Sequence, residues 1–167
     1  TQVLEITVMP LTGRDGQPYG YAGSAVDITA LDYAQKKLQH QLALTERVLE
    51  SNPLPMCLTD MQGRLVTVNA AWEDFMGVPR SQALGRLNRD ILPAAQAQAY
   101  DARTEQLLRE GGPVRYEERL PRADGSMRDV QITKVLLQSA QGEPMGVLVN
   151  KLDITDFLAA RYKAQEA

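Results

Sequence analysis

The stretch GEPMGVLVNKLDIT (residues 142–155) repeats GQPYGYAGSAVDIT (residues 16–29) at a constant offset of 126 residues, 142 minus 16. Six positions are identical: Gly16, Pro18, Gly20, Asp27, Ile28 and Thr29 recur as Gly142, Pro144, Gly146, Asp153, Ile154 and Thr155. Upstream, Ile6, Thr7 and Leu11 recur as Ile132, Thr133 and Leu137. Because this spacing is the size of a domain, it predicts two tandem modules and not a solenoid. We expect the last two strands of one module in residues 1–29 and a complete second module in residues 51–155.

Each repeated stretch runs into a helix. Thr29 and Thr155 are of a residue type that caps helix N-termini. Apolar residues at helical spacing predict an amphipathic connector helix over residues 30–50, and residues 156–167 are expected to form an output linker helix. The connector stripe contains Leu31, Leu38, Leu42 and Leu49. It has two interpretations, a parallel dimer contact, which we favour, or packing against the chain's own sheet.

The segment between these helices has a mixed pattern that predicts an α+β fold. We expect five strands, near residues 56–60, 64–68, 114–122, 127–138 and 144–154. A short helix is expected after the cap residue Asn69, and a longer helix over residues 94–110. The order of two strands, several helices and three strands predicts a five-stranded antiparallel sheet with helices on one face.

Composition and charge exclude several function classes. The 18 Lys and Arg residues against 21 Asp and Glu residues leave a net charge of −3, so the dense basic stripe of a nucleic-acid groove is not expected. No apolar run approaches the roughly 18 residues of a membrane span. A single cysteine, Cys57, excludes an internal disulfide and fits a reducing, cytoplasmic compartment. We expect no metal site and no catalysis, because ligand clusters, phosphate loops and oriented Cys–His pairs are missing from the pattern.

The ordered set of turn, cap and core residues resembles the PAS family. The residues that carry the resemblance are Asn52-Pro53, Thr59-Asp60, Gly63-Arg64, Val68-Asn69-Ala70-Ala71-Trp72, Phe75, Gly77, Gly85, Asp124-Gly125, Gly142, Gly146 and Asp153-Ile154-Thr155. The resemblance covers residues 50–155, with residues 1–29 as the end of a preceding PAS copy. Members of this family sit in sensor histidine kinases, diguanylate cyclases and some transcription regulators, and this copy looks most similar to those of sensor histidine kinases.

The resemblance implies a sensory and dimerisation module of a two-component signalling protein, next to another PAS copy and an output domain. It also implies a signal relay, in which Asp153 and Thr155 tie the last strand to the helix that follows. Asp27 and Thr29 would do the same in the first copy. The alternatives are a plain helix cap at Thr155 and, for the whole module, a ligand-free dimerisation scaffold of a diguanylate cyclase or transcription regulator.

A PAS-like sheet facing short helices implies a cavity for a small molecule, whose identity or presence the sequence leaves open. Haem is disfavoured because the single histidine, His40, lies on the connector. Covalent flavin is disfavoured because the Asn-Cys-Arg-Phe stretch of light-sensing PAS domains is missing. The candidate cavity residues are Trp72, Tyr116, Glu118 and Arg119. Trp72 is more simply a core aromatic than a flavin-stacking residue, and Glu118 could meet a polar ligand, pair with an arginine or reach solvent through a bulge.

Overall fold

The computed structural model describes residues 1–165 and divides into two compact units, with the division between Arg47 and Val48. In the first unit, β1 (Leu4–Thr12) and β2 (Pro18–Asp27) form an antiparallel hairpin. The hairpin runs into α1 (Thr29–Ser51), the predicted connector helix, whose last turn already belongs to the second unit. None of the helices in residues 1–165 combines the length and apolar character that a membrane crossing requires.

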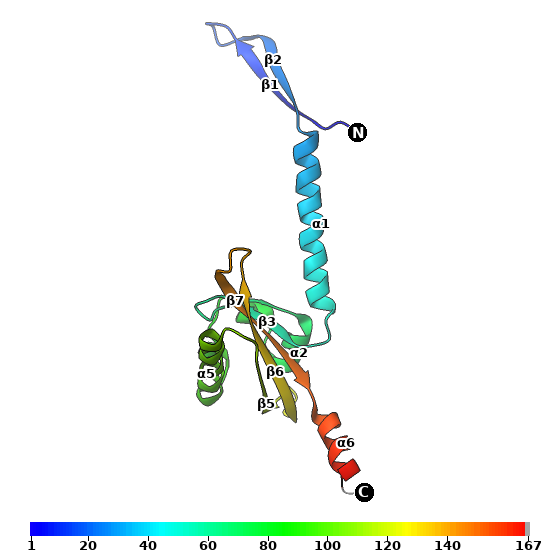
Figure 1. Cartoon of the computed structure of the whole chain (residues 1–167). Coiled ribbons are helices and arrows are strands. Elements are labelled where there is room, and N and C mark those ends of the chain that lie inside the picture. The colour runs from blue at the N-terminus through cyan, green and yellow to red at the C-terminus, as the bar shows by residue number, and fades with distance from the viewer. Residues whose placement is uncertain (166–167) are drawn as a thin grey trace. The chain divides into compact units, whose positions relative to one another are not determined.

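The second unit holds the predicted five-stranded antiparallel sheet. Its elements are β3 (Met56–Thr59), β4 (Leu65–Val68), α2 (Ala70–Met76), α3 (Arg80–Ala83), α4 (Asn88–Ile91), α5 (Ala94–Glu110), β5 (Val114–Pro121), β6 (Met127–Gln138), β7 (Pro144–Asp153) and α6 (Thr155–Gln165). The strands lie in the order β4-β3-β7-β6-β5, so the last strand of the module is central and pairs with both β3 and β6. The helix α5 packs against β5 and β6 (Figure 1). The predicted α+β, PAS-like fold class is confirmed.

The core lies between the inner face of the sheet and the helices α2 and α5. Alternate residues of β6 and β7 point inward, and Val130, Ile132 and Val149 are at most 1% exposed. From the helices, Trp72 and Leu107 close the other side. Each such apolar side chain contributes about 1.5–3 kcal/mol when it leaves water, so this layer fixes which face of each strand is internal.

The sequence repeat is also a repeat of strand register. Leu4 pairs with Asp27 as Val130 pairs with Asp153, and Thr12 pairs with Pro18 as Gln138 pairs with Pro144. Both hairpins shift register at the same step, between residues 11 and 12 and between residues 137 and 138. The hairpin β1–β2 with α1 therefore reproduces β6–β7 with α6, residue pair by residue pair.

Gly146 shows why one of the repeated glycines is needed. It lies on β7 where the backbone of β3 comes close, and a Cβ at this position would collide with the carbonyl oxygen of Thr59. Its counterpart Gly20 on β2 has nothing within 4 Å of the place that a Cβ would occupy. Gly20 therefore has a packing reason only if a further strand lies beside β2, in the way that β3 lies beside β7.

Candidate ligand cavity and helix junction

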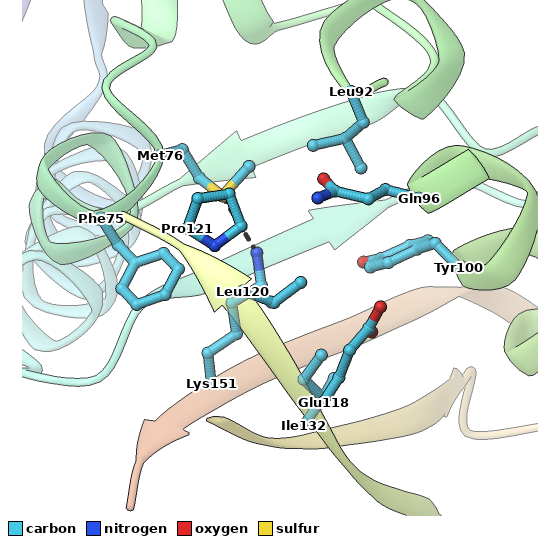
Figure 2. Close-up of a pocket in the computed structure, with 10 residues that line it drawn as sticks. All are labelled: Phe75, Met76, Leu92, Gln96, Tyr100, Glu118, Leu120, Pro121, Ile132 and Lys151. Atoms are coloured by element: carbon cyan, nitrogen blue, oxygen red, sulfur yellow. Dashed lines mark hydrogen bonds between the residues drawn. The ribbon is translucent and has the colours of Figure 1, made fainter. Parts of the chain in front are cut away.

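An internal cavity of about 30 Å³ lies between the sheet and the helices (Figure 2). Its wall includes Phe75 and Met76 of α2, Tyr100 of α5, Glu118 of β5 and Lys151 of β7. Since a water molecule needs at least about 10–15 Å³, the cavity has room for a few small groups in this state. The wall is mainly apolar, with a cation and a carboxylate set into it.

Lys151 supplies the basic group of the cavity. It lies on the central strand and is 6% exposed. Its Nζ donates to Sδ of Met76 at 3.2 Å and lies 5.6 Å from the ring centroid of Phe75 (Figure 2). A thioether is a weak acceptor, and none of the hydrogen bonds or ion pairs of residues 1–165 joins this amine to an oxygen. Burial lowers the pKa of Lys151 below its ordinary value.

Lys134 is a second buried lysine, but its amine is satisfied. It lies on β6 and is fully buried. Its Nζ donates to the carbonyl oxygen of Tyr100 at 2.6 Å and to Oγ1 of Thr104 at 2.8 Å, and it lies over the Tyr100 ring, 3.2 Å from the centroid. Burial lowers the pKa of Lys134 to about 7. This lysine is therefore bound to α5 and does not face the cavity.

The four predicted cavity residues separate into different environments. Glu118 lines the cavity, whereas its neighbour Arg119 is exposed on the other face of the strand, because successive side chains alternate. Trp72 is a core residue, 3% exposed, and borders a narrower space of about 10 Å³ that also touches Lys151. Tyr116 packs on the core with the guanidinium of Arg103 4.8 Å from its ring centroid.

Two buried polar groups lie near this region without a strong partner. The hydroxyl of Tyr116 is buried and makes no hydrogen bond in the described part of the chain, and burial raises its pKa. Cys57 is buried, with Sγ 3.7 Å from the hydroxyl of Tyr100, and burial raises the pKa of the thiol. A thiol held in its neutral form is a poor nucleophile, so Cys57 has the environment of an inert core residue.

The junction between β7 and α6 is built by the Asp-Ile-Thr motif. The Thr155 hydroxyl donates to Oδ1 of Asp153 at 2.6 Å and accepts from the backbone N–H of Asp129 on β6 at 2.9 Å. The N–H of Ile154 donates to the Asp129 carbonyl at 2.8 Å. Burial opposes the charge of Asp153, but the hydrogen bonds from Thr155 and the nearby Arg128 hold its pKa below the ordinary value. The Thr155 hydroxyl therefore bonds to the neighbouring strand β6, which a plain helix cap would not do.

The same junction occurs between β2 and α1. The Thr29 hydroxyl donates to Asp27 at 2.6 Å and accepts from the N–H of Val3 at 3.0 Å, and the N–H of Ile28 donates to the Val3 carbonyl at 3.0 Å. Val3 stands at the offset position of Asp129. The residues Asp27 and Thr29 are therefore brought together as Asp153 and Thr155 are.

The four leucines of the connector stripe lie on α1, of which no residue is buried. Leu31, Leu38 and Leu42 are 56–58% exposed, and Leu49 is half-buried in the second unit. The exposed part of the stripe is available to a partner of apolar character.

Asn69 has a larger role than the helix cap that the sequence predicts. Its Oδ1 accepts from the N–H groups of Trp72 and Met56, at 3.0 and 2.9 Å. Its Nδ2 donates to the carbonyls of Leu49, Asn52 and Leu54 at 2.8–3.2 Å. One buried amide thus joins β3, α2 and the end of α1.

The two buried lysines are the residues that the sequence analysis missed. Period-two alternation would have found them, since Lys134 follows Val130 and Ile132 on the inward face, and Lys151 follows Val147 and Val149. Glu118 stands at the same kind of alternate position on β5, after Val114 and Tyr116. The signal in the sequence was a lysine at a strand position where the alternation expects an inward-facing apolar residue.

Comparisons with known proteins agree with this architecture. A family described as PAS fold matches residues 49–159. The C4-dicarboxylate transport sensor protein DctS of Rhodobacter capsulatus is 29% identical over 124 residues, which are 73% of this chain and 19% of that protein. The chain therefore spans about a fifth of the length of this curated relative.

Two solved structures are similar in fold. The PAS domain of a protein from Colwellia psychrerythraea has a TM-score of 0.58 at 19% identity, with 69% of this chain and 98% of that chain covered. The PAS domain of BvgS from Bordetella pertussis has a TM-score of 0.50 at 22% identity, with 76% and 99% covered.

Proposed function

Because the chain belongs to the PAS-fold family, we propose that residues 51–155 are the sensory module of a signal-transduction protein, and specifically of a sensor histidine kinase. The kinase assignment is supported by the likeness to DctS, a protein named as a sensor. Since the match covers 19% of that relative, the output activity of the whole protein is part of the proposal. The module itself is expected to sense and relay, without a catalytic step of its own.

The observation that carries this proposal is the path from the cavity to the exit helix. Lys151 faces the cavity and stands two residues before Asp153 on the same strand. Because β7 is central and hydrogen-bonded on both sides, a shift at Lys151 is passed along a stiff strand. Asp153 and Thr155 fasten the end of this strand to the first turn of α6. A change in the cavity thus reaches the residues beyond α6 through the backbone.

The proposal includes a domain order for the rest of the chain. Residues 1–29 are the last two strands of a preceding PAS copy, residues 30–50 the connector and residues 156–167 the output linker. The shared register and the unexplained glycine at position 20 support the first assignment. The exposed leucines support a homodimer through the connector. A cytoplasmic location is part of the same proposal, supported by the single reduced cysteine.

One observation favours a second function. The cavity of about 30 Å³ is small next to the roughly 300–1,000 Å³ of typical ligand pockets. A ligand-free PAS scaffold, which only passes motion from the preceding copy to α6, would need no larger space. Mass spectrometry of small molecules released from the purified protein separates the two, because a scaffold releases none.

Replacement of Thr155 by alanine tests the relay. The variant loses two hydrogen bonds at the junction, each worth about 1 kcal/mol. We expect amide exchange in the first turn of α6 to rise at least about fivefold and output regulation of the intact protein to change. Thr45→Ala is the matched control, because this hydroxyl bonds only to its own helix, at the Gln41 carbonyl. Unchanged regulation in Thr155→Ala, despite faster exchange, would rule out the relay.

A further inference from the structure

Lys151 carries a buried amine without an oxygen partner inside the protein. It is 6% exposed and borders the cavity, where its contacts are a thioether and an aromatic ring. An ammonium that is removed from water and left without an anion is strongly unfavourable. Lys134, equally buried, has two oxygen acceptors, so the fold is able to satisfy a buried lysine where one is structural. The contrast indicates that the partner of Lys151 comes from outside the chain.

The repeated hairpin has apolar residues at the positions of both lysines. At the offset of 126, Lys134 corresponds to Val8 and Lys151 to Ala25. The two hairpins share their register, so these positions are equivalent in the backbone. The register of the hairpin is therefore compatible with either residue, and the strand pairing does not depend on the two lysines.

Glu118 adds a second polar group to the cavity. It lies on β5, and Figure 2 shows its carboxylate on the side of Tyr100, while the Lys151 amine lies beside Met76. None of the ion pairs in residues 1–165 joins the two. The cavity thus presents an amine and a carboxylate as separate groups in an apolar wall. A ligand that fits both carries one anionic group and one hydrogen-bond donor.

We propose that this cavity binds a small organic acid, whose carboxylate pairs with Nζ of Lys151 and whose hydroxyl or other donor bonds to the Glu118 carboxylate. The inference rests on the proposed sensory function and names the ligand class of that site. A single ammonium matches a carboxylate better than a phosphate, which needs several donors. The ligand replaces the sulfur of Met76 as the neighbour of the amine. Met76 is an unbranched, adaptable side chain, so the cavity enlarges at this wall when the acid enters.

The test uses the full chain and four probes: acetate, glycolate, neutral acetamide and inorganic phosphate. Their dissociation constants are measured by NMR titration of the backbone amides around the cavity. We expect glycolate to bind most tightly, acetate next, and acetamide and phosphate at least about tenfold more weakly than acetate. Lys151→Met should weaken both acids at least about tenfold. Glu118→Gln should reduce the preference for glycolate over acetate.

Lys134→Met is the matched control, because it removes a buried amine that lies outside the cavity, and it should bind the acids as the wild type does. Lys151→Met is expected to fold, since methionine fills the same space without a charge; Lys151→Ala, which copies the residue at position 25, gives a second variant. Equal binding of acetate and acetamide, or unchanged acid binding by both Lys151 variants, would overturn the inference. Tighter binding of phosphate than of acetate would do so as well.

Hydrogen exchange of the α6 backbone amides distinguishes a failure of this inference from a failure of the proposed function. If the acids bind through Lys151 and α6 does not respond, the ligand class stands and the relay fails. If the acids fail to bind while Thr155→Ala still alters output, the relay stands and the inference fails.

Discussion

At the scale of single residues, buried polar groups determine most of the specific contacts between the elements of this module. Asn69 is 1% exposed and uses both ends of its amide, because its oxygen accepts from two N–H groups and its two N–H donors are shared among three carbonyls. Arg80 makes a second link, with ion pairs of 2.7 and 2.8 Å to Glu50 and Glu73, but this pair is partly exposed and contributes less. The end of α1 is therefore held to α2 mainly by one neutral side chain.

Asn69→Ala should destabilise the second unit by about 2–4 kcal/mol. The substitution removes the side-chain partner of three carbonyl groups and two N–H groups in a region that is at least partly buried. Urea unfolding followed by circular dichroism measures the change. Asn52→Ala is the control, since this side chain accepts one hydrogen bond, from Leu54, and should cost about 1 kcal/mol. Equal losses in the two variants would contradict the role assigned to Asn69.

The sequence allowed good predictions where residue type alone decides the contact. The cap at Asn69, the turn at Asp124-Gly125 and the alternation that turns Glu118 inward depend on near neighbours in the chain. The partners of Lys134 and Lys151 lie on helices 30 to 75 residues away. Whether a buried amine meets an oxygen or a sulfur is settled only by how α2 and α5 are placed, so the partners of the two lysines could not be predicted from the sequence.

At the scale of elements, the central strand β7 is the most constrained part of the fold. It pairs with β3 and β6, borders the cavity and continues into α6. The strand boundaries and the helix over residues 94–110 were predicted closely, because turn residues bracket them. The order of the strands was not predicted, since the pairing of β7 with β3 joins residues about 90 apart and leaves no local signal. The short helices α3 and α4 have four residues each, too few for a helical pattern to predict them.

The two repeated glycines give a matched test of strand pairing. Gly146→Ala should destabilise the second unit by about 1–3 kcal/mol, because the new methyl group meets the Thr59 carbonyl on β3. Gly20→Ala should change the stability of this chain by less than about 0.5 kcal/mol. Thermal unfolding of both variants measures the difference. In a longer protein that contains a complete preceding PAS copy, Gly20→Ala should become as costly as Gly146→Ala.

If Gly20→Ala remained neutral there, the proposal that a strand lies beside β2 would be wrong. The comparison is sharp because the two positions share their register and differ in whether a neighbouring strand is present. It tests the assignment of residues 1–29 without any assumption about ligand or output.

At the scale of the whole molecule, the chain contains two copies of a hairpin followed by a helix. In both copies the helix follows the last strand through the same junction. Each exit helix begins at an Asp-Ile-Thr junction that is hydrogen-bonded to the strand beside it. A helix that starts at a rigid junction transmits motion best when its other end meets a partner helix. The exposed leucines of α1 supply a surface of that kind.

We therefore expect the chain to dimerise in parallel through Leu31, Leu38 and Leu42, spaced by seven and four residues as in a coiled-coil seam. The double variant Leu38→Lys and Leu42→Lys places two like charges opposite their copies and should shift a dimer to monomer in light scattering at the same concentration. Leu44→Lys is the control, because Leu44 is equally exposed, at 56%, but lies off the stripe. A wild-type chain that is monomeric at millimolar concentration would exclude the connector as a dimer contact, since a seam of this length relies on apolar burial to offset the cost of association.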